Sequence, residues 1–250
     1  MNTKPKILLI YTGGTIGMIK DFETGALKAF NFDQLLERIP ELYLLDCTID
    51  TYSFEKPIDS SDMNPTHWIT LAEVIESNYN GFDGFVVLHG SDTMSYTASA
   101  LSFMLKNLNK PVILTGSQLP IGDLRTDAKE NLITAVQIAS LQQNGSPQIK
   151  EVGLYFEYKL YRGNRTTKIS AEHFNAFTSP NLPHLAESGV HLKVNDHLLE
   201  TFYTSHQLEV IKQLDSNVMV LKIFPGITQQ VLQAILNIEN LKGIVIETFG

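Results

Sequence analysis

Cysteine is nearly absent from the sequence, because Cys47 is the only one among 250 residues. A single cysteine cannot form an internal disulfide bond, which excludes the class of disulfide-stapled secreted domains and suits a reducing compartment. We interpret Cys47 as a small buried side chain within a strand.

Positive charge is also scarce. The 19 lysine and arginine residues are outnumbered by 27 aspartates and glutamates, which gives a formal net charge of −8 and a pI near 5.3. Proteins that bind nucleic acids gain much of their affinity from lysine and arginine contacts to phosphates. We therefore expect no nucleic-acid partner.

Long apolar runs are missing. The run at residues 7–10 is too short for the core of a secretory signal, and no small-residue cleavage site follows it. No other stretch approaches the roughly 20 apolar residues that a membrane-spanning helix needs. We predict a cytoplasmic protein without a membrane partner.

Short apolar runs that alternate with amphipathic segments fill most of the chain. Strands are expected at residues 6–11, 48–54, 84–88, 111–115 and 152–156. Helices are expected at residues 65–80, 93–108 and 126–143. This alternation predicts an α/β fold in which helices cover a mostly parallel sheet whose strands are buried on both faces.

Local signals mark where two of these helices begin. Asn64 is a suitable N-cap, and Pro65 suits the first helical position. Asp127 and Glu130 have the spacing of a capping box at the start of the third helix.

Two domains are predicted. Residues 1–185 form an N-terminal catalytic α/β domain, residues 186–209 a linker region rich in loops, and residues 210–250 the start of a C-terminal α/β domain. The second unit should contain a strand at 218–224, a helix at 228–237 and a strand at 243–248. Because no helix follows the last strand, we expect this second domain to be incomplete and the chain to be a fragment.

Polar residues follow four of the expected strands. Ligands of open α/β sheets bind outside the carboxyl ends of the strands, so these segments are the candidate site. They are Thr12–Gly17, Asp59–Met63, His89–Thr93 and Gly116–Pro120.

Each segment also has a structural explanation. The glycines after the first strand match no nucleotide-binding spacing, and they either expose Thr15 at a turn or form a tight turn with Thr12 and Thr15 bonded to backbone. Ser91 and Asp92 are residue types that often cap helices. We interpret His89 as a hydrogen-bonded residue at a strand end, and we expect no metal because no histidine pair has ligand spacing.

The basic segment at residues 162–168 has two interpretations. Most such runs are solvated charged loops. A lysine beside a serine and an aspartate, however, can assist proton transfer at a nucleophilic hydroxyl, and Lys168 is the candidate.

Taken together, these segments resemble the bacterial-type L-asparaginase family, in particular its cytoplasmic type I branch. The matching stretches are YTGGTIGM at 11–18, DSSDMNP at 59–65, DGFVVLHGSDTMSYTASALSFML at 83–105, KPVILTGSQLP at 110–120, LYRGNRTTK at 160–168 and SPNLP at 179–183. The likeness covers most of residues 5–185 and continues more weakly to Gly250.

The resemblance implies an amidohydrolase that needs no cofactor. It makes Thr15 the nucleophile that attacks the side-chain carboxamide of L-asparagine, and it assigns proton transfer to Ser91, Asp92 and Lys168. It also implies homodimers or homotetramers at full length, in which the second domain of one subunit completes a neighbour's site.

Substrate recognition is implied in the same way. Ser60 and Ser61 match the segment that holds the α-carboxylate, and Asp92 would accept a hydrogen bond from the α-ammonium. The backbone carbonyl of Ser117 would orient the carboxamide, with Ser91 beside the substrate.

The chain departs from the family pattern at two places. Ser91 stands where the family usually has threonine, so the β-branch that restricts the rotamer is lost. Gly25 is followed by Ala26 and Leu27, where a loop tyrosine often helps to activate the nucleophile.

Two other functions stay open from the sequence. One is a tRNA-dependent amidotransferase subunit that releases ammonia, although such subunits carry an added N-terminal domain and this chain is acidic. The other is a non-catalytic amino-acid sensor that retains the pocket.

Overall fold

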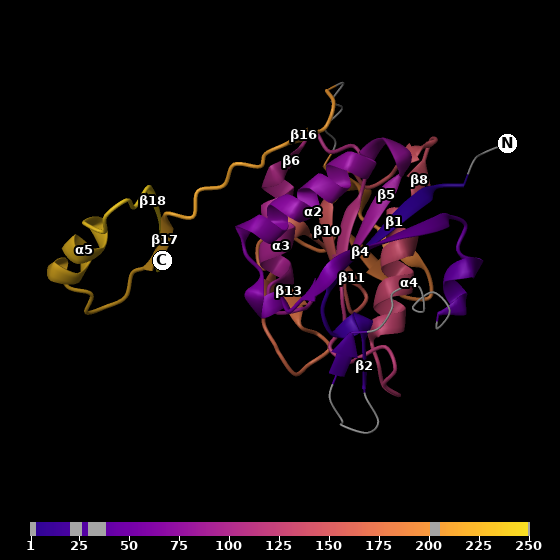
Figure 1. The fold of residues 1–250 in the computed structure, drawn as a ribbon, viewed down its shortest axis with the longest axis horizontal. Helices are drawn as coiled ribbons and strands as arrows, with labels where there is room; N and C mark the ends of the chain where they lie inside the picture. Colours follow the sequence, from indigo (N-terminus) through magenta and orange to yellow (C-terminus); the bar gives the residue numbers. More distant parts are fainter. Residues whose placement is uncertain (1–3, 21–26, 30–38, 201–205, 250) are drawn as a thin grey trace. The chain divides into compact units, whose positions relative to one another are not determined.

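A computed structural model describes residues 4–20, 27–29, 39–200 and 206–249. The chain divides into two compact units, Met1–Ile211 and Lys212–Gly250. Each unit is described by itself (Figure 1).

The first unit is built on an eight-stranded sheet with the order β15-β14-β11-β10-β7-β5-β1-β4. The strands are β1 (Lys6–Gly13), β4 (Thr48–Ile58), β5 (Gly84–Leu88), β7 (Val112–Thr115), β10 (Val152–Phe156), β11 (Lys159–Arg162), β14 (Ala186–Ser188) and β15 (Leu192–Val194). The five strands from β4 to β10 run parallel, and β11, β14 and β15 are added to them by antiparallel pairings. The predicted α/β fold with a mostly parallel sheet is confirmed.

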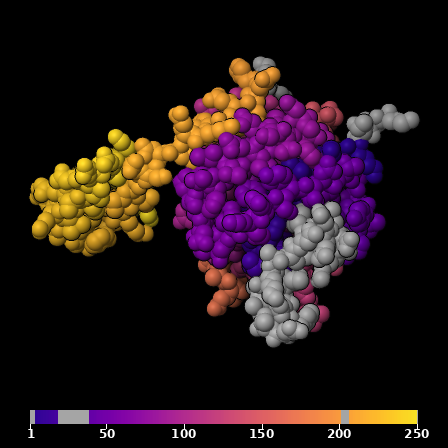
Figure 2. Space-filling view, viewed as in Figure 1, coloured from indigo at the N-terminus to yellow at the C-terminus, as the bar shows by residue number. Residues whose placement is uncertain are grey.

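Helices cover both faces of this sheet because the β1 side chains alternate between two apolar layers. Ile7 and Leu9 pack in the layer of α4 (Ala128–Ala139), while Leu8 and Ile10 pack in the layer of α2 (Pro65–Asn78) and α3 (Met94–Met104). Complete burial of one such side chain contributes roughly 1.5–3 kcal/mol. In Figure 2 the purple atoms of the segment from β4 to α3 form much of the visible face of this unit.

The described residues of the first unit also form four short antiparallel pairs. They are β2 (Met18–Lys20) with β3 (Leu27–Ala29), β6 (Leu105–Lys106) with β16 (Glu209–Val210), β8 (Gln142–Gln143) with β9 (Ser146–Pro147), and β12 (Thr167–Lys168) with β13 (Phe177–Thr178).

The predicted strands and the observed ones differ at the second strand. β4 lies at the edge of the sheet and leaves most of its residues exposed, so the expectation that it is buried on both faces is wrong. The edge position of β4 explains why polar residues alternate along this strand.

Cys47, which was expected as a buried residue within a strand, lies in a bend just before β4 and is only partly buried, although it packs against the core.

The weakly patterned region before the second unit contains more structure than expected. Residues 186–209, expected as a linker, supply β14 and β15 to the main sheet. These strands have only three residues each, which is too short for an alternation of apolar and polar residues to be visible.

Helix starts agree with the sequence in one case and not in another. The Asn64 side chain accepts a hydrogen bond from the Thr66 backbone nitrogen, and Pro65 begins α2, as predicted. The prediction of a capping box at the start of α4 is wrong. The Asp127 side chain makes no cap bond, and Thr126 Oγ1 accepts a hydrogen bond from the Ala128 nitrogen instead.

The second unit is a small β-α-β arrangement. β17 (Val218–Lys222) pairs in parallel with β18 (Gly243–Glu247), and α5 (Gln229–Leu236) connects them. The Thr228 side chain caps α5 by accepting from the Val231 nitrogen. All three elements were predicted. No helix in the described part of the chain has the length and apolar character needed to cross a bilayer.

Candidate active site

Three parallel strands end side by side and bring their following loops together. Tyr11 of β1 lies in register with Leu88 of β5, and Leu88 lies in register with Thr115 of β7. The hydroxyl of Thr12 donates to the Leu88 carbonyl over 2.9 Å, and the His89 nitrogen donates to the Thr115 carbonyl over 2.9 Å. The carboxyl edge of the sheet therefore gathers the polar segments that were predicted there.

Glycines let these loops approach closely. Gly14 lies against the backbone of Gly90, and Gly90 lies against the side chain of Ser60, so neither glycine has room for a side chain. The hydroxyl of Thr93 donates to the Ser60 carbonyl over 2.7 Å. The loops after β1, β4 and β5 are thus packed on one another.

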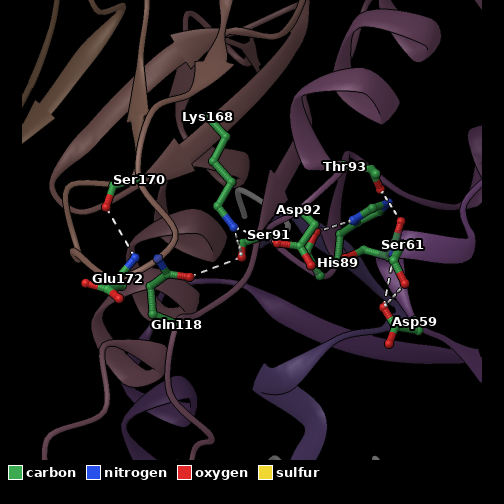
Figure 3. Close-up of polar contacts among 12 residues, drawn as sticks. Asp59, Ser61, His89, Ser91, Asp92, Thr93, Gln118, Lys168, Ser170 and Glu172 are labelled. Carbon is green, nitrogen blue, oxygen red and sulfur yellow. Dashed lines mark hydrogen bonds and ion pairs between the residues drawn. The ribbon is translucent and has the colours of Figure 1, made fainter.

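Lys168 lies beside Ser91 and Asp92 (Figure 3). Its ammonium nitrogen is 2.9 Å from Ser91 Oγ and 2.8 Å from Asp92 Oδ1. The Lys168 side chain is 15% exposed, whereas that of Asp92 is 62% exposed. The fold therefore brings Lys168 to Ser91 and Asp92, which lie 77 and 76 positions before it in the sequence.

The simpler explanations for these residues do not hold in the structure. Thr93 is the N-cap residue of α3 and makes no side-chain cap bond, so Ser91 and Asp92 are not caps. The basic segment is not a solvated loop: Arg162 pairs with the buried Glu151 over 2.6 Å, and Lys168 is mostly buried.

Ser60 and Ser61 lie in a short 3-10 helix after β4. Ser60 is buried, and Ser61 is exposed. The backbone nitrogen and the hydroxyl of Ser61 both lie 2.9 Å from Asp59 Oδ1, and these bonds, led by the backbone one, lower the pKa of Asp59. Asp59 thus shapes the turn that presents both serines.

Thr15 begins the 3-10 turn that follows the glycine pair, and it is partly exposed. Its hydroxyl has no hydrogen-bond partner within the described part of the chain, unlike that of Thr12. The Tyr11 side chain packs against this turn. Its hydroxyl donates to the Gly17 carbonyl over 3.3 Å, and its ring fills the space beside Gly17. Burial raises the pKa of Tyr11 to about 12, which keeps the phenol neutral. The departure at Gly25 and Ala26 lies outside the described residues.

His89 is a buried structural residue, as predicted. Its Nδ1 lies 2.7 Å from the Gly90 carbonyl oxygen, and its Nε2 lies 2.8 Å from Thr97 Oγ1. Burial lowers the pKa of His89 to about 4, so the imidazole is neutral at pH 7.

Ser117, which was predicted as a site residue, lies in the loop after β7, but sequence reasoning missed Asp127 and Asn131, which hold this loop. Ser117 is buried, and its hydroxyl donates to the Leu119 carbonyl over 2.6 Å. Asp127 accepts hydrogen bonds from the backbone nitrogens of Gln118 and Leu119 at 2.9–3.1 Å. Asn131, one helical turn later, donates to the Gly116 carbonyl over 2.9 Å. Polar residues four apart at the start of an apolar helix were the available signal.

A cavity of about 350 Å³ lies elsewhere, at the opposite edge of the sheet where β10 begins. Its charged wall is already satisfied: Glu151 accepts from Arg162 and from the Glu200 nitrogen, and Arg162 also donates to the Leu198 carbonyl. None of the four polar segments that follow the strands lines this cavity. The carboxyl edge is therefore the better candidate site.

Comparisons with known proteins give one matching family and several similar chains. The family model described as "Asparaginase, N-terminal" matches residues 6–200. L-asparaginase 1 of Escherichia coli (strain K12) is 42% identical over 253 residues, covering 99% of this chain and 71% of the relative. The solved structure of L-asparaginase I from Vibrio cholerae (O1 biovar eltor str. N16961) has a TM-score of 0.89 and 39% identity, covering 99% of this chain and 73% of that one.

A more distant relative bears on the alternative function. A glutamyl-tRNA(Gln) amidotransferase subunit of Pyrococcus abyssi (strain GE5 / Orsay) is 34% identical over 252 residues. That alignment covers 98% of this chain and 56% of the relative.

Proposed function

The chain belongs to the asparaginase family, in its type I branch, and on this premise we propose that it is an L-asparagine amidohydrolase, which releases aspartate and ammonia. The observation that carries the proposal is that the Lys168 ammonium contacts both Ser91 and Asp92. The loop of Ser91 and Asp92 packs against the loop that carries Thr15. A hydroxyl nucleophile needs a neighbouring group that moves protons, and this arrangement supplies one.

Thr15 is proposed as the nucleophile. Its oxygen attacks the carboxamide carbon of asparagine, its proton passes to the leaving nitrogen, and ammonia departs to leave an aspartyl ester on Thr15. Water then attacks the ester carbon, aspartate leaves, and the Thr15 oxygen regains a proton. The partly exposed hydroxyl, which has no partner among the described residues, supports this role.

Ser91, Asp92 and Lys168 are proposed to carry protons during both half-reactions. Lys168 donates to both partners, to the Ser91 hydroxyl over 2.9 Å and to the Asp92 carboxylate over 2.8 Å. The limited exposure of Lys168 reduces the screening of its bond to Ser91, whereas its bond to the exposed Asp92 carboxylate stays in contact with water.

Recognition of the zwitterionic substrate is proposed for the surrounding loops. The exposed carboxylate of Asp92 suits an α-ammonium, and the turn of Ser60 and Ser61 suits an α-carboxylate. The Ser117 carbonyl is proposed to orient the carboxamide, in a loop that Asp127 holds in place.

The direct test is ammonia release by the whole chain from L-asparagine, L-glutamine and glutamyl-charged tRNA. We expect release from asparagine. Release that requires charged tRNA would instead support the amidotransferase function, which the acidic composition disfavours. A stable calorimetric binding isotherm for asparagine without continuing heat would support a sensor.

Further properties are proposed with the function. We propose that the unit Met1–Ile211, which includes β14 and β15 of the segment expected as a linker, is the catalytic domain. Cytoplasmic location and assembly into homodimers or homotetramers are proposed from the type I resemblance, and the single cysteine suits a reducing compartment.

A further inference from the structure

Gln118, in the loop after β7, is held through both its backbone and its side chain. Its backbone nitrogen lies 3.1 and 2.9 Å from the two carboxylate oxygens of Asp127. Its side-chain Nε2 donates to the His173 carbonyl over 3.0 Å, and its Oε1 accepts from Ser91 Oγ over 3.1 Å. Figure 3 shows Gln118 between Ser91 and the turn of Ser170.

The His173 carbonyl is itself fixed relative to Lys168. Ser170 Oγ, two residues after Lys168, accepts hydrogen bonds from the backbone nitrogens of Glu172 and His173 at 3.2 and 3.0 Å. The Ile169 nitrogen donates to the Ala176 carbonyl over 2.8 Å, which closes this segment into a loop. Gln118 therefore connects the Ser91 loop to the segment that carries Lys168.

These partners determine which way the Ser91 proton points. A backbone carbonyl only accepts, so the amide nitrogen of Gln118 must face His173 and the amide oxygen must face Ser91. The amide oxygen cannot donate, so the Ser91 hydroxyl donates to it. The Ser91 oxygen is then left to accept from Lys168.

We propose that Gln118 is a positioning residue, which holds the Ser91 hydroxyl with its proton toward the amide and its oxygen toward Lys168. The inference rests on the proposed function of Ser91 in proton transfer. Serine lacks the β-methyl group that limits the χ1 rotamers of threonine, so its hydroxyl turns more freely. Gln118 supplies from a neighbouring loop the restraint that the side chain lacks.

The first test replaces Gln118 by leucine, which has similar size and no acceptor. Gln118→Leu should lower kcat for asparagine by about tenfold or more with little change in KM, because misplacement of a catalytic group costs rate before it costs binding. Gln118→Glu keeps an acceptor toward Ser91, although its carboxylate cannot donate to the His173 carbonyl, so it should retain part of the wild-type kcat that Gln118→Leu loses. Equal losses in the two variants would contradict the proposal.

A double-mutant cycle separates positioning from support of the fold. Once Ser91→Ala has removed the hydroxyl, Gln118→Leu should cause little further loss of kcat. Additive losses would overturn the inference, because Gln118 would then act through the loop and not through Ser91. Thermal unfolding of all four proteins checks that they are equally folded.

Labelling of Lys168 keeps this inference distinguishable from the proposed function. A small acylating reagent, followed by peptide mass spectrometry, should modify Lys168 severalfold faster in Gln118→Leu, because the lysine loses a fixed acceptor. In Ser91→Ala the same Gln118 change should have no effect on labelling. A wild-type chain that releases no ammonia from asparagine would refute the function alone, whereas unchanged labelling in Gln118→Leu would refute the positioning role.

Discussion

A Cβ atom built on Gly14 would lie 2.5 Å from the backbone nitrogen of Gly90, so the loops after β1 and β5 touch through two residues that have no side chain. Each glycine directly precedes a candidate reacting group, Thr15 in one loop and Ser91 in the other. The separation of the two hydroxyl-bearing turns therefore depends on backbone packing.

Gly14→Ala should lower kcat by about a hundredfold or more, because the added methyl group would push the two loops apart. Gly14 also has a φ of 89°, so part of any effect comes from backbone strain. Gly145→Ala is the matched control, since Gly145 has a φ of 76° and nothing within 4 Å of a built Cβ. It should cost about 1 kcal/mol of stability and leave activity intact. Equal activities of Gly14→Ala and Gly145→Ala would show that the close approach of Gly14 to Gly90 does not matter for catalysis.

Thr15→Ala should leave the fold intact and remove nearly all turnover, because loss of a nucleophile from a group that acts as a unit costs about 10⁴-fold or more. Thr15→Ser, which keeps a hydroxyl, is the control and should retain measurable activity. Steady-state ammonia release is the measurement, with circular dichroism to verify folding. Substantial hydrolysis by a well-folded Thr15→Ala protein would exclude Thr15 as the nucleophile.

The sheet could be predicted because its parallel strands are continuous apolar runs. The runs at β5 and β10 have the predicted bounds. By contrast, β14 and β15 carry no pattern of their own and depend on pairing with β11 and with each other. Short strands of this kind are determined by tertiary contacts, which no local window of sequence contains.

In the candidate site too, local sequence identified some residues, whereas tertiary contacts determined how they are arranged. Motif resemblance named Ser91, Asp92 and Lys168, but only the fold shows that they meet. Asp127 was assigned to a capping box because the local spacing allowed it, whereas its carboxylate bonds the loop eight and nine residues earlier. Tertiary partners thus overrode a correct local spacing, and the Gln118 bridge could not be inferred for the same reason.

Lys168→Met should retain binding of asparagine and lose turnover, because the lysine is proposed to act on protons and not on the α-carboxylate. Calorimetry should give a dissociation constant close to the wild-type KM, while kcat falls by about 10²-fold or more. Loss of binding together with activity would make Lys168 a recognition residue.

Asp127→Ala should destabilise the protein and raise KM for asparagine. It removes the acceptor of two backbone N–H groups in the loop of Ser117, and unsatisfied groups of this kind cost about 1–3 kcal/mol. Asp46→Ala is the control, because this carboxylate is 91% exposed and pairs with Lys4 at the surface. Urea unfolding should separate the two variants, and matching midpoints would contradict the role of Asp127.

His89 should make folding stability depend on pH between about 6.5 and 4. In the unfolded chain the imidazole gains a proton below pH 6.5, whereas burial lowers the pKa of His89 in the folded protein to about 4. The unfolded state therefore binds more protons than the folded state between pH 6.5 and 4, so stability is lost as the pH falls through this range. Below pH 4 the His89 contribution no longer changes with pH. The full effect is about 3 kcal/mol.

His89→Asn isolates this contribution from that of the carboxylates. An asparagine amide can still donate to the Gly90 carbonyl, as Nδ1 of His89 does, but it does not titrate. The free energy of unfolding, measured in urea at several pH values, should fall less steeply between pH 6.5 and 4 in the variant than in the wild type. If the variant does not fold, NMR titration of the His89 ring in the wild type gives its pKa directly. A ring that titrates near pH 6.5 would contradict this prediction. It would mean that His89 is in contact with water and that its hydrogen bonds to Gly90 and Thr97 do not keep the imidazole neutral.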